Sequence, residues 1–252
     1  MRVAVIGGTG TLGSVVVAAL QARGHEVRRA SRSSASHPVD LSTGAGLREV
    51  LDGCAAVVDA SNGFGSKAAQ AVLIDGSRRL LEVESAVGVA HHVVVSIVGC
   101  DKVQNAGGFG YYRAKVEQEE VVRTGPVPWT LVRATQFHDL LDTLFAGAAK
   151  VGIRPSVEAP LQPVDVGDVA HAIADAVDSG PLGRTLAVAG PQVASLRDLG
   201  RTWSVATGRR RLPVRVPAWG PLREVGAGAL VDDDPDVRGM TTFASWLKAR
   251  YA

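Results

Sequence analysis

The sequence lacks the features that mark several common classes of protein. It has only two cysteines, Cys54 and Cys100, which are too few for a disulfide framework, and no Cys/His spacing resembles a metal site. No run of roughly eighteen apolar residues indicates a membrane span. A formal net charge of +2 is too small to indicate a nucleic-acid or membrane-surface binder. We therefore expect a cytoplasmic protein that binds a small molecule, without a metal, nucleic-acid or membrane partner.

What the sequence does contain is ordinary globular composition, with 46% hydrophobic and 21% charged residues over 252 positions. This length can bury one large core, so we expect a single domain over residues 1–252. Predicted strands and helices alternate through the first two thirds of the chain. Such alternation favours an α/β fold, a Rossmann-type doubly wound parallel sheet. Residues 151–252, where prolines become frequent, are expected to supply a small substrate-side portion.

The predicted elements follow from apolar runs and from their boundaries. Strands are expected at 3–6, 26–30, 55–60, 90–98, 128–133 and 186–190. Helices are expected at 14–20, 47–51, 67–88, 111–124, 140–150, 166–177, 195–203 and 243–247. The stretch 213–239 is rich in Pro, Gly and Asp and is predicted as a long excursion.

A glycine turn directly follows the first predicted strand. Gly7, Gly10 and Gly13 are spaced G-x-x-G-x-x-G, with Thr9, Thr11 and Leu12 among the intervening residues, and a helix follows. Such a turn lets the backbone approach a pyrophosphate, which then meets the N–H groups at the helix start. The strand–turn–helix context predicts a dinucleotide-binding site.

The residues after the second predicted strand indicate which dinucleotide binds. Ser31, Arg32 and Ser33 follow that strand, and no carboxylate occurs until Asp40. A guanidinium with hydroxyl groups suits the 2′-phosphate of NADP(H), whereas NAD(H) is usually selected by an acidic residue. NADP(H) is therefore favoured over NAD(H). Asp40 and Leu41 are expected to border the adenine. Ala60 and Ser61, at the end of the third predicted strand, are also expected to contact the cofactor.

A Y-x-x-x-K pattern suggests the chemistry. Tyr111 and Lys115 lie four residues apart on one face of a predicted helix, and a strand upstream ends near Ser96. Ser96 would orient a carbonyl, Tyr111 would protonate its oxygen, and Lys115 would hold the nicotinamide ribose and lower the phenol pKa. Tyr112 competes with Tyr111 for the role of acid and is otherwise expected to bind the substrate.

The residues after the strand at 128–133 are candidates for the substrate pocket. Strand ends at this edge of a doubly wound sheet face the ligand crevice, which places Gln136, Phe137 and His138 there. Phe137 could stack on a flat ring. The alternative interpretation makes Phe137 a core residue and His138 a loop residue with satisfied hydrogen bonds.

Several of these motifs together resemble the NmrA-like, atypical short-chain dehydrogenase/reductase proteins. They are the glycine turn, Ser96–Gly99, Tyr111–Lys115, Leu131–His138, Pro163–Ala170 and Gly190–Pro191. The resemblance implies an NAD(P)-binding Rossmann fold with catalytic Ser96, Tyr111 and Lys115. The asparagine that relays protons in many short-chain enzymes has no identifiable counterpart in this sequence, so the resemblance does not extend to that part of proton delivery.

The resemblance leaves three functions open. The first is an NADPH-dependent oxidoreductase that reduces a small cyclic or aromatic carbonyl or quinone. The second is a non-catalytic NADP(H)-binding redox sensor, and the third is a redox-neutral epimerase, dehydratase or cyclase. A homodimer is implied by the family alone.

Overall fold

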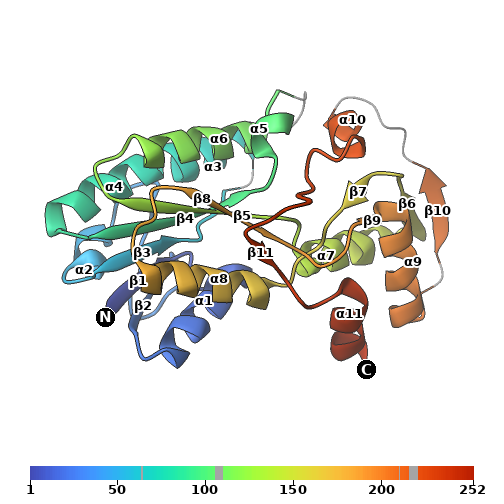
Figure 1. Ribbon diagram of the computed structural model, residues 1–252, viewed down its shortest axis with the longest axis horizontal. Helices are drawn as coiled ribbons and strands as arrows, with labels where there is room; N and C mark the ends of the chain where they lie inside the picture. Colours follow the sequence, from blue (N-terminus) through green and yellow to red (C-terminus); the bar gives the residue numbers. More distant parts are fainter. Residues whose placement is uncertain (64, 106–109, 210, 216–220) are drawn as a thin grey trace.

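The fold is built around one parallel sheet (Figure 1). The computed structural model describes residues 1–63, 65–105, 110–209, 211–215 and 221–252. Seven strands line up in the order β11-β8-β5-β4-β3-β1-β2. Their bounds are β1 Arg2–Ile6, β2 Glu26–Ala30, β3 Ala56–Asp59, β4 His91–Ile97, β5 Trp129–Ala134, β8 Thr185–Ala189 and β11 Val237–Arg238. All neighbouring pairs are parallel. The predicted Rossmann-type sheet is therefore confirmed.

Helices cover both faces of the sheet, which explains why its central strands are almost continuously apolar. Helices α1 (Thr11–Ala22) and α8 (Val166–Ser179) pack against one face, as Figure 1 shows. The opposite face carries α2 (Leu47–Leu51), α4 (Asp75–Val87) and α6 (Gly110–Arg123). Each face forms its own apolar core, and Val3 and Val5 point into one while Ala4 and Ile6 point into the other.

A third apolar cluster lies beside the sheet and gathers later parts of the chain. It includes α7 (His138–Ala149), α9 (Leu196–Thr207), α10 (Pro221–Gly226) and α11 (Phe243–Tyr251). Two small sheets pair β6 (Ile153–Ser156) with β10 (Leu212–Arg215), and β7 (Pro160–Leu161) with β9 (Ala194–Ser195). Residues 151–252 are thus divided between this third cluster and the central sheet. Strands β8 and β11 belong to the central sheet, and α8 packs against one of its faces.

Three predicted elements differ from the structure. The helix expected at 67–88 is split into α3 (Ser66–Ala69), the π-helical turn η1 (Gln70–Ile74) and α4. The helix expected at 140–150 begins at His138, because Phe137 is still extended and bridges Val164. The excursion expected at 213–239 contains part of β10 and all of α10 and β11. Its two strands pair with distant parts of the chain, β10 with β6 and β11 with β8. Local periodicity carries no signal for such long-range pairing.

Side chains near the starts of α8 and α9 accept hydrogen bonds from backbone N–H groups. Ser195 caps α9 by accepting a hydrogen bond from the Asp198 N–H. Asp168 lies in the first turn of α8, and its carboxylate accepts hydrogen bonds from the Met240 and Thr241 N–H groups. Within the residues that the structure describes, no helix combines the length and apolarity needed to cross a bilayer.

Candidate functional site

A cavity of about 510 Å³ opens at the carboxyl ends of the central strands. The chain runs from β1 outward to β2 and then returns to β3 on the other side of β1. Ligands of open α/β sheets bind at this switch in strand order. Four neighbouring strands contribute to the lining of this cavity. The lining residues are Gly10–Gly13 after β1, Ala60–Asn62 after β3, Val95–Ile97 at the end of β4, and Ala134–Phe137 from the last residue of β5 onward.

The glycine turn is shaped for a close backbone approach. Gly7 has φ +75°, and a Cβ built on Gly13 would lie 2.2 Å from the Gly7 carbonyl oxygen. Helix α1 starts at Thr11 without a side-chain cap, so N–H groups of its first turn are available to a ligand. Gly10, Thr11, Leu12 and Gly13 line the cavity. This turn fits a dinucleotide pyrophosphate, as N–H groups and the positive end of the helix dipole favour phosphate.

Beside this turn lies a cluster of three hydroxyl groups. Thr9 Oγ1 donates to Ser31 Oγ at 2.9 Å and lies 3.2 Å from Ser33 Oγ, and the two serine oxygens are 3.3 Å apart. Arg32 is exposed next to them. The other two nearby arginines are held by backbone carbonyls, since Arg28 donates to Glu49 and Val50 and Arg29 donates to Gly8.

Asp40 and Leu41 lie away from this main cavity. Leu41 is buried in the core, and the Asp40 carboxylate accepts hydrogen bonds from the N–H and hydroxyl of Ser42. These bonds, with some help from Arg32, hold the Asp40 pKa below its usual value. Asp40 and Arg32 border a second hollow of about 600 Å³. The side chain of Leu41 is thus engaged in packing, which differs from the expectation that it borders an adenine.

Lys115 is buried at the inner wall of the main cavity. Its Nζ donates to the Val95 carbonyl and to Gln118 Oε1, both at 3.0 Å. Burial lowers the Lys115 pKa, and the neighbouring Asp59, Cys100 and Glu119 act in the opposite direction. Two of the three ammonium protons therefore have protein acceptors, and the side chain lines the cavity with Tyr111.

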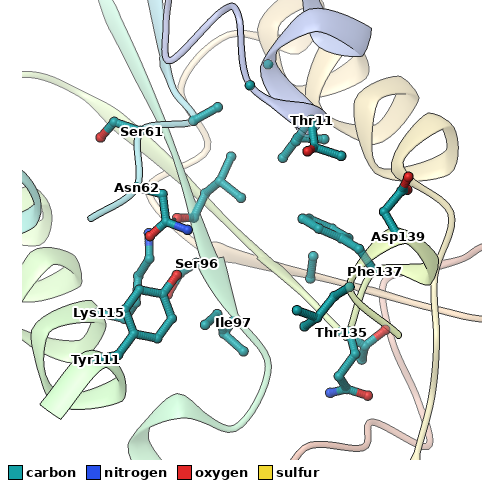
Figure 2. A pocket seen from close by; sticks show the side chains of 18 of the residues that line it. Thr11, Ser61, Asn62, Ser96, Ile97, Tyr111, Lys115, Thr135, Phe137 and Asp139 are labelled. Carbon is teal, nitrogen blue, oxygen red and sulfur yellow. The ribbon is translucent and has the colours of Figure 1, made fainter. Parts of the chain in front are cut away.

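Tyr111 and Tyr112 both line the cavity, and their rings meet edge to face with centroids 5.9 Å apart. Burial raises the pKa of Tyr111 to about 12, although a hydrogen bond with Asn62 partly offsets this. The phenol therefore stays protonated at neutral pH, and Lys115 is not among the groups that shift its pKa, which corrects the expectation that Lys115 lowers it. Figure 2 shows Tyr111, Lys115 and Asn62 on one wall, across from Thr11 and Phe137.

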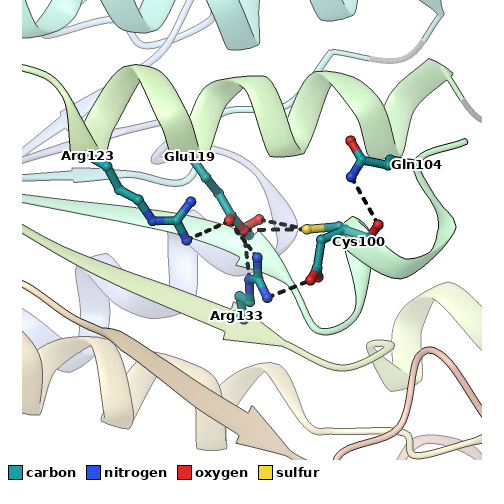
Figure 3. A network of polar contacts seen from close by, with 7 residues as sticks. Cys100, Gln104, Glu119, Arg123 and Arg133 are labelled. Carbon is teal, nitrogen blue, oxygen red and sulfur yellow. Dashed lines mark hydrogen bonds and ion pairs between the residues drawn. The ribbon is translucent and has the colours of Figure 1, made fainter.

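Ser96 lines the cavity, but its hydroxyl belongs to a buried polar network beneath α6 (Figure 3). Ser96 Oγ lies 3.9 Å from Cys100 Sγ, and that thiol donates to Glu119. Glu119 also accepts two hydrogen bonds from Arg133, at 2.9 and 2.7 Å. Although burial opposes it, hydrogen bonds from Arg133 and Ser96 lower the Glu119 pKa. The network ties α6, and thus Tyr111 and Lys115, to strands β4 and β5.

The substrate-side wall is mostly apolar or already hydrogen-bonded. Gln136 uses both ends of its amide, donating to the Leu230 carbonyl and accepting from the Gln162 N–H. Thr135 Oγ1 accepts from the Gly190 N–H. Phe137 lines the cavity and also packs against the core, so both alternatives raised for it describe part of its position.

His138 is not brought to the cavity. It is fully buried, and its ring lies 5.5 Å from that of Phe243 and 5.7 Å from that of Trp246. Burial lowers the His138 pKa, so the imidazole is neutral at pH 7. The reason is that α7 begins at this residue, which turns the side chain towards α11. This corrects the expectation that His138 belongs to the substrate pocket.

Asn62 and Gln118 were missed by sequence reasoning. Asn62 lies two residues after the predicted strand end at Ala60, and Gln118 follows Lys115 by one helical turn. The sequence feature that could have pointed to them is Asp59, a charged residue type inside an otherwise apolar predicted strand. His91 and His92 begin β4, where His91 hydrogen-bonds to Thr130 and His92 to Glu84. In the described part of the chain, no cluster of three or more His, Cys, Asp or Glu side chains could hold a metal.

Comparison with known proteins agrees with this geometry. A family model described as NAD(P)H-binding matches residues 7–180. A (4-alkanoyl-5-oxo-2,5-dihydrofuran-3-yl)methyl phosphate reductase from Streptomyces griseus is 32% identical over 134 residues. That match covers 52% of this chain and 47% of the relative, so this chain matches about half the length of that protein.

Two solved structures share the fold over nearly the whole chain. An NADPH-dependent quinone oxidoreductase from Escherichia coli, solved with NADPH, superposes with a TM-score of 0.79 at 18% identity and covers 99% of this chain and 100% of its own. A short-chain dehydrogenase/reductase superfamily protein from Agrobacterium tumefaciens with bound NAD has a TM-score of 0.75 at 19% identity, covering 99% and 95%. The family match shows that the chain belongs to the NAD(P)H-binding family, and the two solved structures show the fold that it shares with them.

Proposed function

We propose that the protein is an NADPH-dependent reductase of a small, uncharged cyclic or aromatic carbonyl or quinone. The observation that carries this proposal is that Tyr111 and Lys115 share one cavity with the uncapped start of α1. A cofactor site and a proton donor are thereby within one hollow. The related reductase from Streptomyces and the fold shared with a quinone oxidoreductase support the same reaction class.

The residues have distinct roles in this proposal. A bound nicotinamide cofactor supplies the hydride that reduces the substrate carbon. Tyr111, protonated because burial raises its pKa to about 12, donates its proton to the oxygen, so that the carbonyl becomes an alcohol. Lys115 binds the cofactor ribose with its remaining proton, since the other two are held by Val95 and Gln118. Bulk water then restores the tyrosine proton.

NADPH is preferred because of the cluster formed by Thr9, Ser31 and Ser33, with Arg32 beside it. Hydroxyl groups within 2.9–3.3 Å of one another can donate together to the oxygens of one phosphate monoester. Arg32 adds a charge-assisted hydrogen bond. An acidic residue that would select the ribose of NAD(H) is absent from Ser31–Ser33.

The cavity lining favours an uncharged substrate. Lys115 is the one lysine or arginine among the described lining residues, and it is held by Val95 and Gln118. Asp139 is the acidic residue of the lining, and it would repel a phosphate. The substrate of this protein is therefore proposed to lack the phosphate that is named for the Streptomyces relative.

The test is NADPH oxidation by the purified protein with a panel of neutral quinones and cyclic ketones and with phosphate-bearing carbonyl compounds. We expect tight NADPH binding and consumption with neutral substrates only. Lys115→Met should abolish turnover, whereas Lys248→Met on the surface of α11 should not. NADPH binding without turnover over the whole panel would contradict the reductase, and loss of binding would contradict the cofactor site.

A further inference from the structure

A buried polar chain connects Lys115 to a carboxylate on the neighbouring strand β3. Lys115 Nζ donates to Gln118 Oε1 at 3.0 Å, and Gln118 Nε2 donates to Asp59 Oδ2 at 3.1 Å. The same Nε2 also donates to Ser77 Oγ at 3.0 Å. All four side chains are buried, with relative exposures of 4% or less. None of these contacts involves solvent-exposed groups, so water does not screen them.

The chemistry of the two ends determines how the Gln118 amide is oriented. A lysine ammonium can only donate hydrogen bonds, and an ionised carboxylate can only accept them. The amide oxygen must therefore face Lys115 and the amide nitrogen must face Asp59. Gln118 thus lies between the two buried end groups and hydrogen-bonds to both.

The other oxygen of the same carboxylate organises the opposite part of the site. Asp59 Oδ1 accepts a hydrogen bond from the Ser61 N–H at 2.9 Å. Ser61 and Asn62 line the cavity, and Asn62 is hydrogen-bonded to Tyr111. One carboxylate is therefore connected to the lysine through Gln118 and to the tyrosine through the segment that carries Asn62.

We propose that Asp59 is a positioning residue, which holds the Lys115 ammonium through Gln118 and holds Tyr111 through Ser61 and Asn62. This inference rests on the proposed function, because it assigns Lys115 and Tyr111 to the reaction. Asp59 does not line the cavity, so it would act through Gln118 and the Ser61–Asn62 segment and not by touching the substrate.

The charge of Asp59 should have a measurable effect on Lys115. Burial drives Lys115 towards its neutral form, and the groups that oppose this are Asp59 on β3, Cys100 on α5 (Cys100–Val103) and Glu119 on α6 itself. Glu119 is already paired with Arg133, and burial raises the pKa of the Cys100 thiol to about 11, which keeps it neutral at pH 7. Asp59 is therefore the main counter-charge for Lys115.

The experiment compares Asp59→Asn with the wild-type protein. The substitution keeps the shape and removes the charge. Lys115 should then lose its proton about one pH unit lower, and NADPH binding above that pH should weaken about tenfold. Titration of the lysine Cε signals by NMR reports the first effect, with the Lys115 signal assigned by its loss in Lys115→Met. The pH dependence of the NADPH dissociation constant reports the second.

Two further variants keep the test decisive. Asp142→Asn also turns a buried carboxylate into an amide, but Asp142 lies on α7 and is bonded to Trp203 and Tyr251, so this substitution should leave both titrations unchanged. Gln118→Met keeps the side-chain volume and removes the link, so it should shift Lys115 in the same direction if Asp59→Asn does not fold. An unchanged Lys115 titration in a folded Asp59→Asn or Gln118→Met protein would overturn the proposal.

The two proposals can fail separately. If the wild-type protein binds NADPH and reduces nothing, the reductase assignment fails, while the NMR titration still decides whether Asp59 acts on Lys115. If the wild type is an active reductase and Asp59→Asn has the same Lys115 titration and the same pH profile, the positioning role fails and the proposed function stands.

Discussion

Tyr111 and Tyr112 are adjacent in sequence and border the same cavity, yet their surroundings differ. Tyr111 is hydrogen-bonded to Asn62, whereas Tyr112 packs against the apolar cluster beside the sheet. We predict that Tyr111→Phe lowers kcat by roughly 10²–10⁴-fold, the usual contribution of a general acid, and leaves the NADPH dissociation constant unchanged. Steady-state kinetics with Tyr112→Phe as the matched variant checks this. A larger loss in Tyr112→Phe would exchange the two roles.

Arg32 is the residue on which cofactor preference is predicted to depend. Since Arg28 and Arg29 donate to backbone carbonyls, Arg32 is the arginine placed beside the hydroxyl cluster. Loss of one charge-assisted hydrogen bond is worth about 1.5–3 kcal/mol, so Arg32→Ala should weaken NADPH binding by roughly tenfold or more and leave NADH binding as it is. Fluorescence titration with both cofactors measures this. Arg78→Ala on α4 is the control, and an equal effect on NADH would refute the 2′-phosphate contact.

At the level of elements, the start of α1 depends on the absence of a side chain at Gly13. A Cβ there would lie 2.2 Å from the Gly7 carbonyl oxygen, so Gly13→Ala must push the helix away from the turn. We expect loss of NADPH binding and a lower melting temperature. The matched variant is Gly147→Ala in α7, where an added Cβ meets open space. It should raise the free energy of unfolding by about 0.5–1 kcal/mol, as measured by denaturant unfolding.

Helix α6 carries both proposed functional residues, and the position of this helix is set at one buried carboxylate. Glu119 lies one turn after Lys115 and receives hydrogen bonds from Arg123 and Arg133. Such pairs contribute geometry more than stability, because the desolvation of both charges offsets much of their attraction. The site is thus placed by α6 as a unit, with Arg133 of β5 determining its register against the sheet.

For the molecule as a whole, the buried His91 makes stability depend on pH. Burial, with a smaller effect of His92, lowers the His91 pKa from 6.5 to about 4. The unfolded chain therefore binds more protons than the folded one between these values, so the free energy of unfolding rises with pH from about 4 to 6.5 and falls on acidification. The single-site contribution is about 3 kcal/mol from the size of this shift.

Urea unfolding at several pH values, with His91→Asn as the variant, measures this contribution. His91→Asn retains a polar side chain near Thr130 and removes the titration, so the pH dependence between 4 and 6.5 should become shallower. The buried His92–Glu84 pair is present in both the wild type and His91→Asn, so its contribution to the pH dependence of unfolding cancels when the two proteins are compared. Equal slopes in the two proteins would show that His91 does not titrate as proposed.

The sequence by itself determined the sheet, the glycine turn and the Y-x-x-x-K helix. Each of these is a local pattern: Val3–Ile6 is apolar because its strand is buried on both faces, and the turn from Gly7 to Gly13 needs residues without side chains. Patterns of this kind can be recognised within a few residues. The NAD(P)H-binding character followed from them, and the family match confirms it.

Only the tertiary structure decided how distant polar groups meet. His138 turned into the core because α7 begins one residue after the bridge between Phe137 and Val164, which a periodic pattern does not reveal. Asp59, Gln118 and Lys115 come from β3 and α6, and their hydrogen bonds depend on how that helix lies on the sheet. Side-chain contacts across elements depend on packing distances and rotamers, and these exist only once the chain has folded.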